Sequence, residues 1–232
     1  MPSVLITGAN RGLGLEFVKQ YSEEGWRIFA CCRNPGQAGE LNELSEASNG
    51  RLSLHKLDVS SHSSIAGFAD ELRNEPIDIL LNNAGIYGDE NHDDFGKIDY
   101  DKWAATFAVN VMGAMRMVEA FVEDVQTSER KILAFVSSLM GSIADNESGG
   151  SYMYRSSKAA LNAMARSLAI DLKDRGLKAV ILHPGWVLTD MGGEKAPILP
   201  QESIKGMREV LENLTAEDSG RFLSYDGKEL PW

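Results

Sequence analysis

The chain has 232 residues, of which 43% are hydrophobic and 25% charged, and its formal net charge is −11 at pH 7. This composition is that of an ordinary globular protein, and the length allows one large α/β domain or two small ones. The negative charge argues against nucleic acids and anionic membranes as partners, because both repel a protein of the same sign. The sequence contains no linker, repeat or low-complexity run, so we expect a single domain spanning residues 1–232.

We expect neither a signal peptide nor a membrane span. Residues 1–8 lack a basic region followed by an apolar run, and no stretch approaches 18 uninterrupted apolar residues. The two cysteines, Cys31 and Cys32, are adjacent and therefore cannot join distant segments. We interpret them as small apolar residues in a strand of a cytoplasmic protein.

The first elements of the chain have the form of a dinucleotide-binding unit. A short apolar strand leads into the glycine-rich stretch 7–14, and a helical pattern follows over residues 15–24. Gly8, Gly12 and Gly14 permit a tight turn and a close approach of the backbone to pyrophosphate, and the helix start supplies unpaired N–H groups. Their spacing differs from the G-x-G-x-x-G fingerprint, so this stretch alone is weak evidence for a nucleotide site.

The second predicted strand, residues 26–32, ends next to Arg33. In dinucleotide-binding folds an acid near this point binds the ribose 2′-hydroxyl, whereas an arginine suits a 2′-phosphate. There is no acid here, and a second cation, Arg11, lies in the glycine-rich stretch. The two arginines favour NADP over NAD; the alternative is that both are solvated surface residues.

The remaining elements continue the alternation of strands and helices. We predict further strands over residues 52–59, 77–81, 131–136, 178–182 and 220–225, and helices over residues 37–48, 61–73, 100–126, from Tyr154 to about Arg175, and 202–213. Apolar strands separated by helices are typical of a parallel sheet that is covered on both faces. The fold class is therefore α/β: a Rossmann-like, doubly wound, mostly parallel sheet of seven strands.

Small and polar residues follow several of these strands: Asp58, the segment 82–85, Ser138 and the segment 184–189. Ligands of such folds bind outside the carboxyl ends of the strands, so we expect these residues to converge with the glycine-rich stretch. Asp58 has two interpretations, since it either meets the adenine edge of a cofactor or caps the next helix. We interpret the acidic segment 87–100 as a surface loop.

The helix predicted over residues 100–126 combines an apolar stripe with one polar residue. The stripe consists of Trp103, Phe107, Val111, Met115, Val118 and Val122. The polar residue, Asn110, is either a satisfied amide or a catalytic group.

Tyr154 and Lys158 are four residues apart, so on a helix their side chains lie on one face. A phenol has a pKa of about 10, and a neighbouring ammonium group in a partly dry cleft favours the phenolate. Such pairs also occur by chance on solvated helices. Tyr152 is six residues from Lys158 and does not share its face.

As a set, these motifs resemble those of the short-chain dehydrogenase/reductases, over nearly the whole chain. The matching residues are Thr7-x-x-x-x-Gly12-x-Gly14, Asn82-Asn83-Ala84-Gly85, Asn110, Ser138, Tyr154-x-x-x-Lys158 and Pro184-Gly185. Segments 137–143, 152–158 and 183–193 and the ending Pro231-Trp232 are similar to C-factor-like proteins and to the sniffer type of carbonyl reductase. One departure is the segment 145–150, which lengthens the interval between Ser138 and Tyr154.

The resemblance implies an NADP(H)-dependent carbonyl reductase or alcohol dehydrogenase. Tyr154 would be the general acid, and Lys158 would lower its pKa and bind the nicotinamide ribose. Ser138 would hydrogen-bond the substrate carbonyl, and Asn110 would hold a water of the proton relay. The residues expected to touch the cofactor are Gly8, Arg11, Gly12, Leu13, Arg33, Asp58, Val59, Asn83, Tyr154, Lys158, Val187 and Thr189.

Other interpretations concern function and assembly. The similarity to C-factor leaves open a dinucleotide-binding signalling protein with incidental turnover, and a non-redox enzyme such as an epimerase is a third candidate. We expect a small carbonyl or alcohol substrate and a homodimer or homotetramer formed through the helices that carry Asn110 and Tyr154. The segment 188–213 is a candidate lid. We expect no metal, because the four histidines, His55, His62, His92 and His183, lack ligand spacing.

Overall fold

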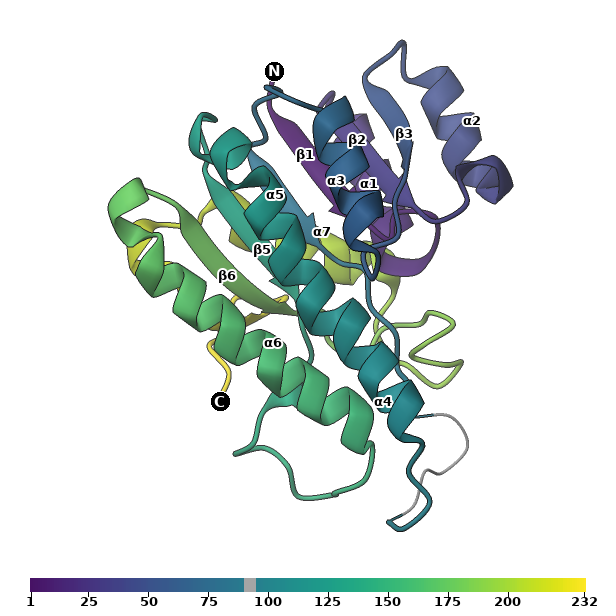
Figure 1. The fold of residues 1–232 in the computed structure, drawn as a ribbon, viewed down its shortest axis with the longest axis vertical. Coiled ribbons are helices and arrows are strands. Elements are labelled where there is room, and N and C mark those ends of the chain that lie inside the picture. The colour runs from purple at the N-terminus through teal and green to yellow at the C-terminus, as the bar shows by residue number, and fades with distance from the viewer. Residues whose placement is uncertain (90–94) are drawn as a thin grey trace.

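A computed structural model describes residues 1–89 and 95–232 and shows a twisted sheet between two layers of helices (Figure 1). The strands are β1 (Ser3–Thr7), β2 (Arg27–Cys32), β3 (Leu52–Lys56), β4 (Ile79–Asn82), β5 (Ile132–Val136), β6 (Lys178–His183) and β7 (Phe222–Ser224). Their order is β3-β2-β1-β4-β5-β6-β7, and every adjacent pair is parallel. The predicted fold class is confirmed, and the seven-stranded sheet is parallel throughout.

The strands are apolar runs because the sheet is buried on both faces. Successive side chains point to opposite faces, so Val4 and Ile6 of β1 lie in one core cluster and Leu5 in the other. One face is covered by α1 (Gly12–Glu23), α2 (Gly39–Ala47) and α7 (Pro200–Glu212), and the other by α3 (His62–Glu71), α5 (Ala114–Gln126) and α6 (Tyr152–Asp171). Cys31 and Cys32 are buried free thiols in β2, as predicted.

Two helix ends are defined by local chemistry. The Ser61 hydroxyl accepts a hydrogen bond from the Ser64 N–H and caps α3. Asp58 does not cap that helix; its carboxylate accepts hydrogen bonds from the N–H and the hydroxyl of Ser60, at 2.9 and 2.7 Å. At the other end of the domain, α6 is followed by a short 3₁₀ turn, and Gly176 in the left-handed conformation (φ 73°) ends it, as predicted.

The helix predicted over residues 100–126 consists of α4 (Tyr100–Phe107), a π-helical segment η2 (Ala108–Gly113) and α5. The apolar stripe of the sequence does not form the buried face of this helix, because only Val118 of its six members is buried. The buried face instead begins with Thr106, Asn110 and Gly113. Here the helix approaches other backbone so closely that a Cβ at Gly113 would lie 2.7 Å from the Val59 carbonyl oxygen. A helix that packs closely against other backbone needs small or hydrogen-bonding residues at the contact. The apolar stripe in the sequence does not indicate where such a contact lies.

By length and composition, the continuous helix Tyr100–Gln126 could cross a membrane, a test that core helices of soluble proteins also pass. Its C-terminal half packs on the sheet, where Met117, Phe121 and Val125 are completely buried. We therefore interpret it as a core helix.

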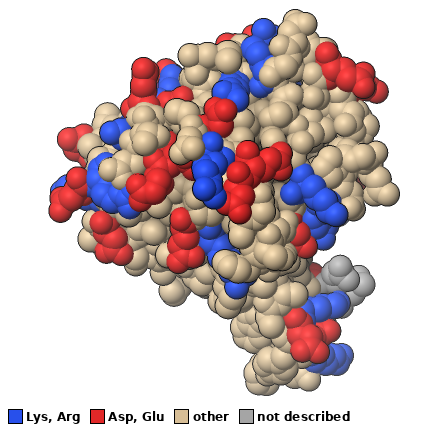
Figure 2. Space-filling model, turned by 45° about the horizontal axis from the view of Figure 1, so that its top comes forward, with Lys and Arg blue, Asp and Glu red and all other residues tan. Residues whose placement is uncertain are grey.

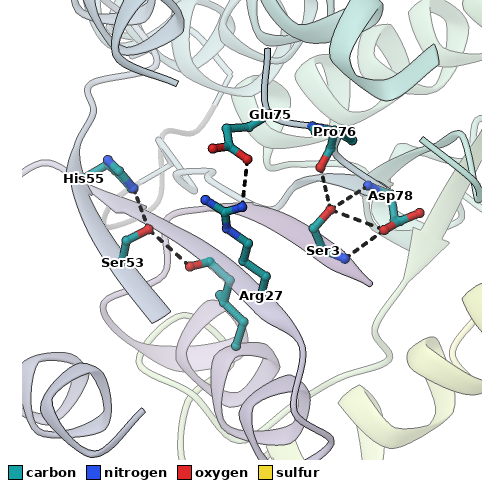
Figure 3. A network of polar contacts seen from close by, with 8 residues as sticks. Ser3, Arg27, Ser53, His55, Glu75, Pro76 and Asp78 are labelled. Carbon is teal, nitrogen blue, oxygen red and sulfur yellow. Dashed lines mark hydrogen bonds and ion pairs between the residues drawn. The ribbon is translucent and has the colours of Figure 1, made fainter. Parts of the chain in front are cut away.

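Polar side chains fix the beginnings of the strands, at the sheet edge away from the glycine-rich stretch (Figure 3). The Asp78 carboxylate, just before β4, accepts a hydrogen bond from the Ser3 N–H of β1 at 2.8 Å. Its other oxygen accepts one from the Arg130 N–H, just before β5, at 3.1 Å. One carboxylate thus links the beginnings of the three neighbouring strands β1, β4 and β5. The C-terminal ends of these strands lie together at the opposite edge of the sheet.

Acidic and basic side chains are interspersed over the face shown in Figure 2. Many acidic and basic side chains of the described residues form ion pairs, such as Arg175 with Glu123 at 2.7 Å. On this face the net negative charge is therefore not gathered into one acidic patch.

We expect Phe121→Ala to lower the free energy of unfolding by about 3–5 kcal/mol, because it opens a cavity between α5 and the sheet. The Phe121 ring is completely buried and lies 5.3 Å from the Phe68 ring, centroid to centroid. Met112→Ala is the control on the same helix, since Met112 is 50% exposed; it should change stability by less than about 0.5 kcal/mol. Denaturant unfolding measures both, and equal losses would contradict the packing described here.

Candidate cofactor and catalytic site

The loops after β1 and β4 are joined by hydrogen bonds. The Thr7 hydroxyl accepts from the N–H groups of Asn83 and Ala84, both at 3.0 Å. The Asn83 side-chain amide donates to the carbonyl oxygens of Thr7 and Gly8, at 2.9 and 3.3 Å. A Cβ at Gly14 would lie 2.1 Å from the Gly8 carbonyl oxygen, so the start of α1 packs directly on the turn. The predicted convergence of these two segments is thus present.

The start of α1 has the features of an anion cradle. Its N-cap residue, Arg11, makes no side-chain cap, and the first turn contains no acid. The first N–H groups of a helix have no intrahelical acceptor, and together with the dipole they favour an anion. Gly12 is left-handed (φ 53°), and a Cβ there would meet only the side chain of Thr189, at 3.8 Å. These residues fit the pyrophosphate of a dinucleotide.

Arg11 and Arg33 line one cavity of about 350 Å³, together with Asn10, Asn34 and Gln37. Within residues 1–89 and 95–232, no acid lines this cavity. Asp58 lies near Arg33, and the pKa of its carboxyl is below the ordinary value, first because the Ser60 hydroxyl donates to it and less because of the Arg33 charge. On its outer side, Arg11 forms an exposed ion pair with Asp190 at 3.0 Å.

The remaining predicted cofactor contacts differ in their surroundings. Val59 and Val187 are 8% and 4% exposed, and the Leu13 side chain packs against the core.

Tyr154 and Lys158 share one face of α6, as their spacing predicted. The Lys158 ammonium lies 5.6 Å from the centroid of the Tyr154 ring and donates to the Val136 carbonyl oxygen at 2.9 Å. The side chains are 8% and 4% exposed, respectively. Burial lowers the pKa of Lys158 to about 8 and raises the pKa of Tyr154 to about 12, although a hydrogen bond with Ser138 opposes the second shift. The expected lowering of the tyrosine pKa is therefore not found in the protein alone, because desolvation dominates.

Of the two serines after β5, Ser138 is the one that lies close enough to the Tyr154 phenol to oppose the rise in its pKa. The Ser137 hydroxyl is buried and donates to the Asn162 side-chain oxygen at 2.5 Å. The turn η3 (Leu139–Gly141) is held by His183 of β6, whose Nδ1 accepts from the Leu139 N–H at 3.1 Å. Burial lowers the pKa of His183 to about 4, so the ring stays neutral and accepts this hydrogen bond at neutral pH.

Asn110 connects the loop after β4 to α6. Its amide nitrogen donates to the Ile86 carbonyl oxygen at 2.9 Å and to the Ser157 hydroxyl at 3.0 Å, and its oxygen accepts from the Ile86 N–H at 2.9 Å. An asparagine side chain offers two donors and two acceptor positions. Only one acceptor position is left for the predicted relay water, so the side chain mainly positions the loop.

Comparison with known proteins decides the family. A profile of the family described as short chain dehydrogenase matches residues 2–198. The chain belongs to the short-chain dehydrogenase family. It is accordingly an oxidoreductase, as the motifs predicted.

The relatives of this short-chain dehydrogenase include C-signal of Myxococcus xanthus, which is 44% identical over 165 residues, 71% of this chain and 98% of that protein. A second is 1-hydroxy-2-glutathionyl-2-methyl-3-butene dehydrogenase of Rhodococcus sp. (strain AD45), 33% identical over the whole of both chains. Among solved structures, carbonyl reductase Sniffer of D. melanogaster superposes over 100% of both chains with a TM-score of 0.92 and 31% identity. NADPH-bound carbonyl reductase from chicken fatty liver has a TM-score of 0.92 and 33% identity over 100% of this chain and 99% of its own.

Three residues of this dehydrogenase escaped the sequence analysis: Tyr87, Asp89 and His183. Tyr87 and Asp89 lie in the segment interpreted as an acidic surface loop, yet both contact α6. Residues 90–94 of that segment, including His92, lie outside the described residues. His183 had a usable signal, since it stands at a strand end beside Pro184-Gly185.

The predicted lid segment, residues 188–213, has two parts. Residues 188–199 are irregular, and Leu188, Met191 and Leu199 are 39–55% exposed. The second part is α7, whose Ile204 and Met207 are completely buried in the core. A closing motion remains a prediction, and only for residues 188–199. Metal-ligand clusters of three or more His, Cys, Asp or Glu are absent from residues 1–89 and 95–232.

Proposed function

We propose that the protein is an NADP(H)-dependent carbonyl reductase or alcohol dehydrogenase, with Tyr154 as the general acid and base. The observation that carries this proposal is the Tyr154 phenol, which is buried beside Ser138 and adjacent to the Lys158 ammonium. The similarity to carbonyl reductases, one of them described as NADPH-bound, supports the same reaction.

The cofactor side of the site supports NADP(H) in preference to NAD(H). When bound, the cofactor would supply or accept the hydride. The uncapped start of α1 and Gly12 would hold its pyrophosphate. Arg11 and Arg33 would bind the 2′-phosphate in the cavity they line, because a guanidinium group matches phosphate geometry. Lys158 would donate to the nicotinamide ribose.

In carbonyl reduction, Tyr154 would give its proton to the substrate oxygen while Ser138 donates a hydrogen bond to the same atom. A pKa of about 12 keeps the phenol protonated at neutral pH, so the acid form is always available. Lys158 would stabilise the phenolate that forms. Asn110 would fix the loop beside the pair, with its remaining acceptor position facing a relay water.

Two further features support more specific proposals. The half-buried apolar stripe on the helix Tyr100–Gln126 supports a homo-oligomer formed through that face. The identity of 44% with C-signal supports, as a second candidate, a dinucleotide-binding signalling protein. The presence of all the predicted catalytic residues favours the enzymatic function over the signalling function.

We expect Tyr154→Phe to lower kcat/KM for NADPH-dependent reduction of aldehydes and quinones by about 10²–10⁴-fold, because the proton donor is lost. NADPH binding, followed by its fluorescence, should change less than about twofold, since the ring is kept. Tyr152→Phe is the matched control, because Tyr152 does not share the face of Lys158. Full turnover in the Tyr154 variant would rule out this mechanism.

We expect the rate of carbonyl reduction at saturating NADPH to fall as the pH rises through about 8. The pKa of Lys158 is lowered to about 8, so its stabilising charge is present below that pH and is lost above it. Tyr154, with a pKa of about 12, stays protonated across this window. A Lys158→Met variant should be slower, and its rate should no longer fall near pH 8. A fall near pH 8 that persists in this variant would assign the titration to another group.

We expect Arg33→Ala to raise KM for NADPH by about 10- to 100-fold with KM for NADH nearly unchanged, because a charge-assisted contact to the 2′-phosphate is lost. Arg73→Ala is a control for the change in net charge; Arg73 is exposed just after the C-terminal end of α3 and pairs with Asp70. Steady-state kinetics with both cofactors measures the ratio. An equal rise for NADPH and NADH would place Arg33 away from the 2′-phosphate.

A further inference from the structure

The start of α6 has no cap from its own chain segment. Met153 and Tyr154 are the second and third residues of the helix, so their N–H groups have no intrahelical acceptor. Ser151 occupies the N-cap position in a left-handed conformation (φ 47°, ψ 47°) and makes no side-chain cap. Its hydroxyl is instead hydrogen-bonded to the Tyr87 hydroxyl at 2.8 Å.

Asp89, in the loop after β4, supplies the missing acceptors. One carboxylate oxygen accepts from the Met153 N–H at 3.2 Å and the other from the Tyr154 N–H at 2.8 Å. A carboxylate at a helix N-terminus also complements the helix dipole. The helix that carries the proposed acid is therefore capped by a residue far away in the sequence.

The segment that carries Asp89 is itself held at several points. The side chain of Asn110 binds both the N–H and the carbonyl oxygen of Ile86. The Tyr87 ring lies 4.8 Å from the Tyr154 ring, centroid to centroid. Gly88 is left-handed (φ 80°), and a Cβ there would lie 2.3 Å from the Thr106 hydroxyl oxygen, so this position requires glycine. The segment is thus fixed before it reaches α6.

We propose that Asp89 is a positioning residue for Tyr154. By accepting the N–H of Tyr154 itself, its carboxylate sets the first turn of α6 and holds the phenol against Ser138 and Lys158. This inference rests on the proposed function. Lys158 lies one turn further along, inside the helical hydrogen-bond ladder, so the loss of Asp89 displaces the acid without displacing the lysine that would bind the ribose.

The cap is tested first without any substrate. In Asp89→Ala, amide hydrogen exchange at Met153 and Tyr154 should accelerate by at least about fivefold, while exchange at Lys158 stays unchanged. Asp89→Asn keeps one acceptor oxygen and should show a smaller increase. Unchanged exchange at Tyr154 in the alanine variant would overturn the proposal.

The positioning role is tested by kinetics of the whole protein with NADPH and a reactive aldehyde. Asp89→Ala should lower kcat about tenfold, because small displacements of a reacting group cost much of its rate, and leave KM for NADPH within about twofold. Asp89→Asn should recover most of the rate. A rise in KM for NADPH with kcat unchanged would overturn the proposal.

Asp99→Ala is the matched control. Asp99 also caps a helix with its carboxylate: it is the N-cap residue of α4, and its Oδ1 accepts from the N–H groups of Asp101 and Lys102, both at 3.0 Å. Its loss should destabilise the start of α4 and leave kcat within about twofold. An equal fall in kcat in both variants would show that only general stability is affected and would overturn the proposal. Because the exchange measurement needs no turnover, failure of the proposed function gives a different result from failure of this proposal.

Discussion

Burial of the Lys158 ammonium is the constraint on which the site depends. A buried charge is costly unless it is paired or hydrogen-bonded. The Lys158 ammonium therefore donates a hydrogen bond to the Val136 carbonyl oxygen at the end of β5. To place it there, α6 must approach the turn after β5 so closely that a Cβ at Gly141 would lie 2.8 Å from the Lys158 backbone. The same approach brings Ser138 to Tyr154. The end of β5, its turn and the first two turns of α6 thus form one unit.

Both pKa shifts in this unit have the same cause, which is loss of water. Desolvation favours the neutral form of each group, so it raises the pKa of the phenol and lowers that of the ammonium. At neutral pH the tyrosine therefore holds its proton firmly. In the proposed reaction, the substrate oxygen would become strongly basic on receiving a hydride, and transfer of this proton would then become favourable. Exclusion of water would thereby keep Tyr154 protonated until the hydride has moved.

The sequence predicted the sheet well because each strand is a short apolar run that needs only local information. It also predicted that the glycine-rich stretch 7–14 and the segment 82–85 meet, since parallel strands direct their carboxyl ends to one edge. It failed where a residue's role depends on a partner far away in the chain. The buried face of the helix with Asn110 is small and polar because other backbone lies against it, and periodicity favours a larger apolar face instead. The carboxylate of Asp89 looked like one more solvated charge, because nothing local shows that a helix start lacks its own cap.

The starts of α1 and α6 show how one physical property serves two purposes. Each presents unpaired N–H groups and the positive end of a dipole, and each could bind an anion. At α6 the N–H groups of Met153 and Tyr154 are satisfied by the Asp89 carboxylate. At α1 the N-cap residue makes no side-chain cap, and no acid lies in the first turn. Under the proposed function, an anionic cofactor would therefore bind at α1, and the carbonyl group of the substrate would meet the phenol at α6. A carboxylate at the start of α1 and its absence at α6 would reverse this division.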